Sequence, residues 1–136
     1  MIKHEIKIRP RYAETDQMGM VYYGRYAEYF EVARTECIRS IGIAYAELEK
    51  KHNILLPVRE FQVKYYKPAY YDDELTIITY IKKFPTVRIR FYYEVYNQNN
   101  DFLTEGFAEL VFIDGKTRRP VKPPEFFLDL IRRNWE

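Results

Sequence analysis

The 136-residue sequence is poor in the side chains that most hydrolytic enzymes use as nucleophiles or metal ligands. It has one cysteine, Cys37, one serine, Ser40, and two histidines, His4 and His52. No G-x-S-x-G motif surrounds the serine, and neither nucleophile has a histidine close to it in the sequence. No H-x-x-x-H or C-x-x-C pair is present either. The composition therefore argues against serine or cysteine hydrolysis and against a metal cofactor.

Long hydrophobic runs are also lacking, since no apolar stretch approaches the ~20 residues of a membrane span. The N-terminal segment "MIKHEIKIRPRY" alternates charged and apolar residues, unlike a secretory signal. A lone cysteine cannot form an intramolecular disulfide, which agrees with a reducing compartment. We therefore expect a cytoplasmic protein without integral membrane contact. The length favours one domain, residues 1–136.

The charge balance excludes a broad nucleic-acid-binding surface. Lys and Arg together number 22 against 20 Asp and Glu, so the net charge is only +2. No G-x-G-x-x-G or phosphate-loop pattern occurs, which leaves a nucleotide cofactor unsupported. We expect neither a nucleic-acid partner nor any cofactor.

The hydrophobic periodicity changes once, early in the chain. Residues 2–12 alternate with period two, as in a strand with one buried face. From Tyr23 to Ile41 the period becomes three to four, which predicts an amphipathic helix ended by Gly42. The predicted buried stripe consists of Tyr23, Tyr26, Ala27, Phe30, Ala33, Cys37 and Ile41. The predicted solvent faces carry Glu28, Glu31, Arg34, Glu36 and Arg39.

The rest of the chain is mainly strand-like. A short helix over residues 44–51 precedes extended runs at 54–67, 74–84, 86–98 and 102–113, separated by tight turns. Pro124 opens a final short helix. This order predicts an α+β fold with an antiparallel sheet of about five strands and one long helix. One helix cannot cover such a sheet and both its edges, so we expect a homo-oligomer.

The remaining candidates for chemistry are carboxylates, and Asp16 differs from the others. Most acids stand beside basic residues or in turns, whereas Asp16 lies in the largely apolar segment "TDQMGMVYYGRY" that leads into the long helix. The first N–H groups of a helix are unpaired and carry partial positive charge, so they polarise an oxygen docked there. A carboxylate facing that oxygen could attack the carbon or activate water. Alternatively, Asp16 simply bonds amides of its own loop.

Two blocks of the sequence resemble the hotdog-fold acyl-CoA thioesterases, in particular the 4-hydroxybenzoyl-CoA thioesterase-like branch and its Tol-Pal-associated type. The first block is "RYAETDQMGMVYYGRYAEYFEVARTE", which has the signature aspartate, a glycine three residues later and a tyrosine-rich helix ending in Ala-Arg-x-Glu. The second is "VKYYKPAYYDDELTI", with Pro-Ala followed by Asp-Asp-x-Leu. The two blocks and the strand order together cover nearly the whole chain.

The resemblance implies that a long helix is wrapped by a curved antiparallel sheet, in dimers or tetramers with sites at subunit interfaces. It implies acyl-CoA thioester hydrolysis without metal or cofactor, with Asp16 as nucleophile or general base. The backbone N–H of Tyr23 would bind the thioester oxygen. Substrate-binding positions fall on Gly19, Val21, Tyr22, Gly24 and Tyr26. Many Tol-Pal-type relatives carry histidine at the Tyr23 position, so the acyl group, aryl or aliphatic, stays open.

Three alternatives remain at this point. The substrate could be an acyl-carrier-protein thioester, or the domain could bind acyl-CoA without turnover. A hydratase or dehydratase on the same fold would need a histidine near the helix start, where neither histidine lies. Phosphate-binding cations for coenzyme A could come from Arg59, Lys64, Arg88 or Arg90, among which the sequence does not choose.

Overall fold

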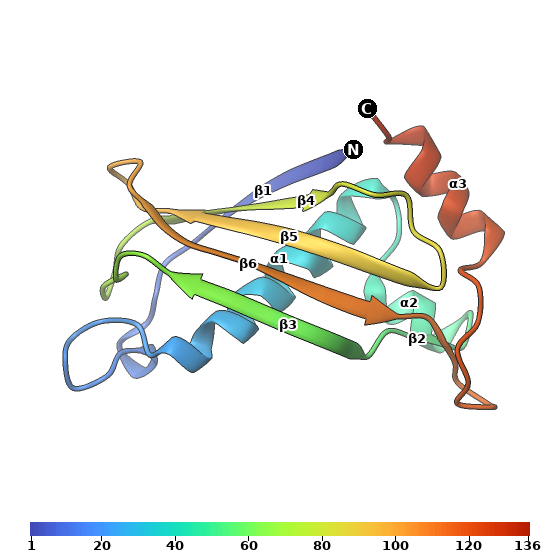
Figure 1. The fold of residues 1–136 in the computed structure, drawn as a ribbon, viewed down its shortest axis with the longest axis horizontal. Helices are drawn as coiled ribbons and strands as arrows, with labels where there is room; N and C mark the ends of the chain where they lie inside the picture. Colours follow the sequence, from blue (N-terminus) through green and yellow to red (C-terminus); the bar gives the residue numbers. More distant parts are fainter.

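A five-stranded antiparallel sheet curves around one long helix in the computed structural model, which describes residues 1–136 (Figure 1). The strand order is β1-β4-β5-β6-β3, so β1 and β3 form the two edges. These strands are β1 (Ile2–Ile8), β3 (Val58–Tyr65), β4 (Leu75–Ile81), β5 (Arg88–Tyr96) and β6 (Phe102–Val111). The predicted α+β class and five-stranded sheet are confirmed.

The smaller elements lie around one end of the sheet. They are the helices α2 (Tyr45–Lys50) and α3 (Glu125–Arg133) and the short paired strands β2 (Ile54–Leu55) and β7 (Ile113–Asp114). The expected strand over 54–67 is thus interrupted, because Pro57 stands between β2 and β3. No helix is long and apolar enough to cross a membrane.

The inner face of the sheet is apolar because the strand residues alternate as predicted. In β4, Leu75, Ile77 and Ile81 are fully buried, while the residues between them, except Thr79, are partly exposed. The long helix α1 (Tyr26–Ile41) lies across this face (Figure 1). Burial also raises the pKa of the Cys37 thiol to about 12, as expected for a cysteine that packs rather than reacts.

The start and the faces of the helix differ from the prediction. Tyr23–Arg25 form a 3-10 turn before α1 begins at Tyr26, and Tyr23 and Ala27 are exposed. Arg34 is buried although a solvent face was predicted for it. It lies one turn from both Phe30 and Ile38, so its aliphatic stem falls beside the buried stripe. Gly42 ends the helix as predicted, with a φ of 124°.

Contact between helix and sheet centres on Phe30. Its ring stacks on that of Tyr93 with centroids 4.3 Å apart and planes 2° from parallel. Close approach is possible because β6 has Gly106 beneath the ring. A methyl group built there would lie 2.5 Å from the carbonyl oxygen of Gln62 and 3.1 Å from Cε2 of Phe30. The height of the helix above the sheet therefore depends on a residue without a side chain.

We expect Gly106→Ala to lower the free energy of unfolding by roughly 2–3 kcal/mol, because backbone and ring must both move. Urea denaturation measures the change. Asn99→Ala, in the exposed β5–β6 turn, is the control and should stay within about 0.5 kcal/mol of the parent. Equal stability of the two variants would show that the sheet relaxes around the methyl group at little cost.

Candidate active site

Asp16 lies in a loop that joins β1 to the helix start and folds back on itself. The Asp16 N–H donates to the carbonyl oxygen of Met20 (2.9 Å), and the Gly19 N–H donates to that of Asp16 (3.0 Å). Gly19 has a φ of 81°, where a side chain would be strained. The Asp16 carboxylate accepts hydrogen bonds from the N–H groups of Met18 (2.8 Å) and Met20 (3.4 Å). The aspartate thus does hold its own loop, as one of the two sequence interpretations required.

The loop is fixed to a turn that lies fifty residues later in the sequence. The Val21 N–H donates to the carbonyl oxygen of Ala69 at 2.8 Å, and Met20 forms an antiparallel bridge with Tyr70. Ala69 and Tyr70 belong to the "PAYYDD" turn. The two sequence blocks that carry the family resemblance therefore meet in space.

A cavity of about 320 Å³ opens where these segments meet the helix start. Its lining comes from the loop, the helix start and the end of β3 with the residues after it: Asp16, Met20, Val21, Tyr23, Tyr26, Tyr65, Tyr66, Lys67 and Pro68. The Tyr65 hydroxyl donates to the carbonyl oxygen of Tyr23 at 3.0 Å. The rings of Tyr65 and Tyr26 meet edge to face, 5.3 Å apart. Tyrosines thus form one wall, with Asp16 in the same cavity.

The helix start, whose Tyr23 lines this cavity, has amides without a partner inside the helix. In the 3-10 turn at Tyr23–Arg25, the Arg25 N–H donates to the carbonyl oxygen of Tyr22, and the Tyr22 N–H donates to that of Glu14. Tyr23 and Gly24 stand at the start of the helix, where no helical carbonyl oxygen lies before them in the chain. Their N–H groups therefore have no partner within the helix. Their partial positive charge suits an anionic or carbonyl oxygen.

Four of the seven predicted site residues line the cavity: Asp16, Val21, Tyr23 and Tyr26. The other three shape its surroundings. Gly19 makes the loop turn, and the ring of Tyr22 packs against that of Tyr23 with centroids 4.6 Å apart. The same Tyr22 ring occupies the space over Gly24, where an added methyl group would come within 2.9 Å of it.

The last residue of β3 and the three residues after it were missing from the predicted site. Tyr65, Tyr66, Lys67 and Pro68 are far from Asp16 in sequence, and only the second resemblance block pointed to this stretch. Lys67 supplies the cavity's one cationic side chain and lies 3.9 Å from a carboxylate oxygen of Asp101. Its distance and exposure make that ion pair weak.

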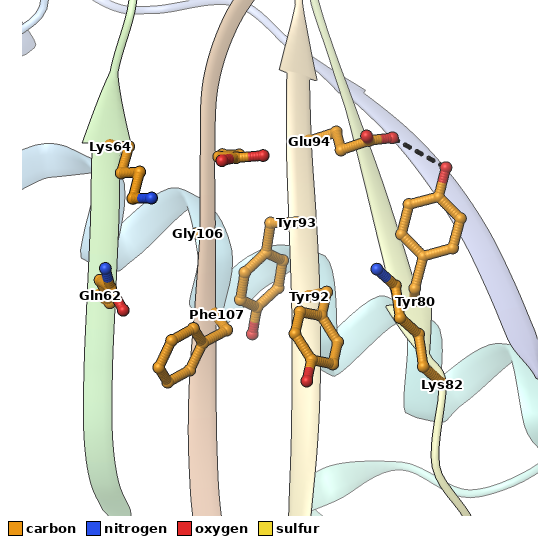
Figure 2. Close-up of a pocket in the computed structure, with 10 residues that line it drawn as sticks. Gln62, Lys64, Tyr80, Lys82, Tyr92, Tyr93, Glu94, Gly106 and Phe107 are labelled. Atoms are coloured by element: carbon orange, nitrogen blue, oxygen red, sulfur yellow. Dashed lines mark hydrogen bonds between the residues drawn. The ribbon is translucent and has the colours of Figure 1, made fainter.

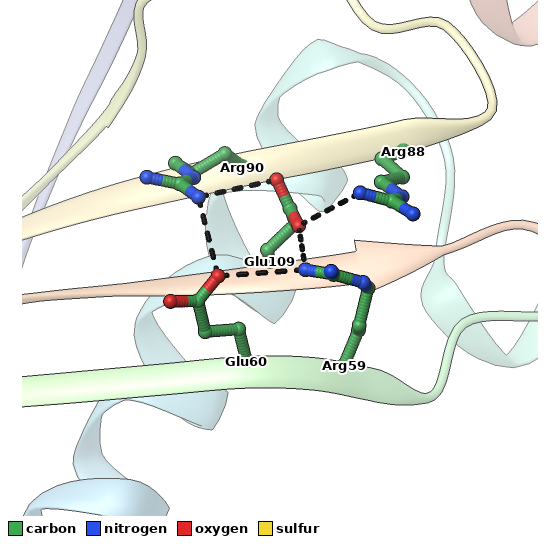
Figure 3. Close-up of polar contacts among 5 residues, drawn as sticks. All are labelled: Arg59, Glu60, Arg88, Arg90 and Glu109. Carbon is green, nitrogen blue, oxygen red and sulfur yellow. Dashed lines mark hydrogen bonds and ion pairs between the residues drawn. The ribbon is translucent and has the colours of Figure 1, made fainter.

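The four cations considered for coenzyme A lie elsewhere. Arg59, Arg88 and Arg90 surround Glu109 on the outer face of the sheet, at 2.7, 3.7 and 3.3 Å (Figure 3). Lys64 also lies on that face, in a different cavity (Figure 2). The three arginines are largely neutralised by Glu109 and Glu60, and none of the four lines the Asp16 cavity.

The second cavity, of about 310 Å³, is a groove over the middle of the outer sheet face (Figure 2). Its acids are already engaged: Glu94 accepts from the Tyr80 hydroxyl at 2.8 Å, and Glu105 accepts from that of Tyr66 at 2.7 Å. Burial and the Glu94 carboxylate raise the pKa of Tyr80 to about 12, so this phenol remains a donor. None of the residues that line this groove belongs to a helix. The Asp16 cavity is therefore the better candidate.

No group of three or more histidine, cysteine, aspartate or glutamate side chains is arranged to hold a metal ion. The candidate site therefore consists of one carboxylate, the helix-start amides, one lysine and a tyrosine-rich wall. Such a set can polarise a carbonyl group and present an oxygen nucleophile or base to it.

The chain matches a known family and several of its members over most of its length. Residues 10–131 match the thioesterase-like superfamily. A putative acyl-CoA thioesterase of Bacillus subtilis, YneP, is 32% identical over 127 residues, covering 93% of this chain and 90% of that protein. The acyl-CoA thioester hydrolase YbgC of Escherichia coli is 31% identical over 118 residues, 87% of each protein.

A solved structure gives the same answer for the fold. The DHNA-CoA thioesterase from Staphylococcus aureus superposes with a TM-score of 0.89 at 36% identity, over 97% of this chain and 88% of that chain. The resemblance predicted from the two sequence blocks, and the class of thioester hydrolase that it implies, are therefore confirmed. The chain belongs to the thioesterase-like superfamily and has the hotdog fold.

Proposed function

We propose that this protein hydrolyses an acyl-CoA thioester with Asp16 as the catalytic carboxylate and the Tyr23 N–H as the oxyanion donor. One observation carries the proposal: Asp16 and the first residue of the helix start line the same cavity. Both loop amides bind the Oδ1 atom of Asp16, so Oδ2 has no hydrogen-bond partner in the chain. That oxygen is free to act on a substrate.

Two routes use these groups. Oδ2 can attack the carbonyl carbon, forming an acyl–aspartyl anhydride and releasing the coenzyme A thiolate, after which water hydrolyses the anhydride to the free acid. Alternatively, Oδ2 takes a proton from water as the water oxygen attacks the carbonyl carbon. The tetrahedral intermediate then releases the coenzyme A thiolate and leaves the free acid. In both routes negative charge develops on the carbonyl oxygen, where the helix-start amides and the helix dipole stabilise it.

The acyl group would lie against the tyrosine wall. Tyr26 and Tyr65 present ring surfaces that suit a planar aryl group, and the solved relative with 36% identity is described as a DHNA-CoA thioesterase. The same surfaces can pack against an aliphatic chain, and the B. subtilis and E. coli relatives are named simply for acyl-CoA. Rates over aryl, short and long acyl-CoAs will rank the two classes.

We also propose that the protein is a homodimer formed along β3. This edge strand exposes apolar side chains, with Val58, Phe61 and Tyr65 between 41% and 48% exposed. The other edge, β1, exposes Lys3, Glu5 and Lys7 instead, and charged side chains protect an edge from pairing. Light scattering after size exclusion should give at least twice the chain mass of 16.6 kDa. A single-chain mass at all concentrations would contradict the proposal.

Two rival functions give different results in the same assays. A domain that only binds acyl-CoA would show tight binding without thiol release. A carrier-protein thioesterase would turn over acyl groups on the carrier protein much faster than the same groups on coenzyme A. Comparable or faster release from coenzyme A supports the proposed substrate.

We expect Asp16→Asn to lower kcat by about 10²–10⁴-fold, because the amide cannot act as nucleophile or base. Release of free thiol from acyl-CoA measures the effect. Asp72→Asn is the matched control, since Asp72 lies in an exposed turn with a positive φ that asparagine also tolerates. Full turnover by the Asp16 variant would refute the assignment.

We expect Lys67→Ala to raise KM for an acyl-CoA about fivefold, because one exposed contact to a phosphate is worth ~1 kcal/mol. The KM for the same acyl group on N-acetylcysteamine, which has no phosphates, should not change. Lys64→Ala is the control, as Lys64 is on the outer face. If both substrates respond equally, Lys67 contacts the acyl group or the loop instead.

A further inference from the structure

Glu14 is a buried carboxylate with no role in the chemistry above. It lies two residues before Asp16 and is only 6% exposed. Glu14 Oε1 accepts hydrogen bonds from the Arg11 N–H at 2.8 Å and from the Tyr29 hydroxyl at 2.9 Å. Glu14 Oε2 accepts from the Arg11 guanidinium at 3.2 and 3.1 Å. A buried charge with this many donors needs a reason to be there.

The contacts of Glu14 join the Asp16 loop to the central helix. Arg11 stands at the beginning of the loop, whereas Tyr29 is a buried residue of α1. The Glu14 backbone adds a second link, because its carbonyl oxygen accepts from the Tyr22 N–H at 2.9 Å, just before the helix start. Glu14 therefore fixes both ends of the loop against the element that carries the proposed oxyanion donor.

Among the contacts that anchor the loop through Glu14, the hydrogen bonds from the Tyr29 hydroxyl and from the Arg11 N–H are the strongest. Burial raises the pKa of Glu14, but the hydrogen bonds and the Arg11 charge outweigh it, so the pKa lies below its ordinary value. The carboxylate is thus ionised at neutral pH, and hydrogen bonds to an ionised group are stronger than neutral ones. The Arg11 guanidinium is 82% exposed, so its ion pair adds little.

We propose that Glu14 is a positioning residue that holds the Asp16 loop on α1 through Tyr29, so that the Asp16 carboxylate faces the helix-start amides. This inference deepens the proposed function and rests on it. A displacement of about 1 Å in a reacting group can cost roughly 10²-fold in rate. The loop's other anchors hold its far end, at Ala69 and Tyr70. Its first half is also held by the Tyr12–Tyr71 ring contact and by a 3.4 Å bond from the exposed Arg25 guanidinium to the carbonyl oxygen of Ala13, and Glu14 adds a bond to a buried residue of α1.

Three variants test the anchor. Glu14→Ala removes all side-chain contacts, and Tyr29→Phe removes only the hydroxyl from the helix. Glu14→Gln keeps one carbonyl oxygen that can still accept from the Arg11 N–H and the Tyr29 hydroxyl. Glu36→Gln is the control, because Glu36 is a partly exposed acid of the same helix that pairs with Arg39, away from the loop.

The expected result is a change in kcat rather than KM. Glu14→Ala should lower kcat by about 10- to 100-fold with KM within about threefold, since most cavity walls come from other elements. Glu14→Gln should keep most of the parent's turnover, Tyr29→Phe should lie between Glu14→Gln and Glu14→Ala, and Glu36→Gln should match the parent. Hydrogen exchange of the amides in residues 12–22 should accelerate in the same order.

Asp16→Asn, measured alongside, separates the two proposals. If it loses turnover while Glu14→Ala and Tyr29→Phe keep theirs, the positioning role is wrong and the proposed function stands. If Asp16→Asn keeps turnover, the proposed function fails, and the positioning role fails with it. Should Glu14→Ala not fold, Tyr29→Phe decides: unchanged kcat and unchanged loop exchange in that variant overturn the anchor.

Discussion

The contact of Phe30 with Tyr93 and with the bare backbone at Gly106 holds the central helix on the sheet. It sets how closely the central helix approaches the curved sheet and therefore where the first turn of that helix lies. The proposed oxyanion donor is part of that turn. A helix held farther from the sheet would carry its amides away from the end of β3, where Tyr65 binds the carbonyl oxygen of Tyr23.

The positions of the Asp16 loop and of the turn after β3 follow from this placement. Once the helix start is fixed, Glu14 ties the loop to Tyr29, and the loop returns to the turn after β3 through Val21 and Ala69. Each step uses a short hydrogen bond between segments distant in sequence. The Asp16 carboxylate, which we propose to be catalytic, is thus held through one oxygen by the N–H groups of Met18 and Met20, while its other oxygen stays free.

Much of this could be predicted from the sequence. Alternating residues placed the strands, the three-to-four spacing placed the helix, and the isolation of Asp16 among apolar neighbours marked the loop. The faces of the helix were harder, because Arg34 buries its stem beside Phe30 and a charge alone suggests solvent. Tyr65 and Lys67 could not be assigned by local pattern, since only tertiary structure brings the end of β3 to the loop.

Glu14 was missed for a related reason. In sequence it resembles any acid beside an arginine, and its burial appears only when Tyr29 is folded over it. The arginines around Glu109 are the converse case. Their charge allowed phosphate binding, and the sequence did not choose among them. Their strands place them on the outer face, where they neutralise neighbouring acids (Figure 3).

The walls of the Asp16 cavity come from two segments, residues 16–26 and 65–68. These segments meet only when β3, the turn after it and the loop are all in place. A chain in which these segments have not yet met would have no cavity. Turnover during refolding should consequently report the fraction of molecules that have completed their long-range contacts.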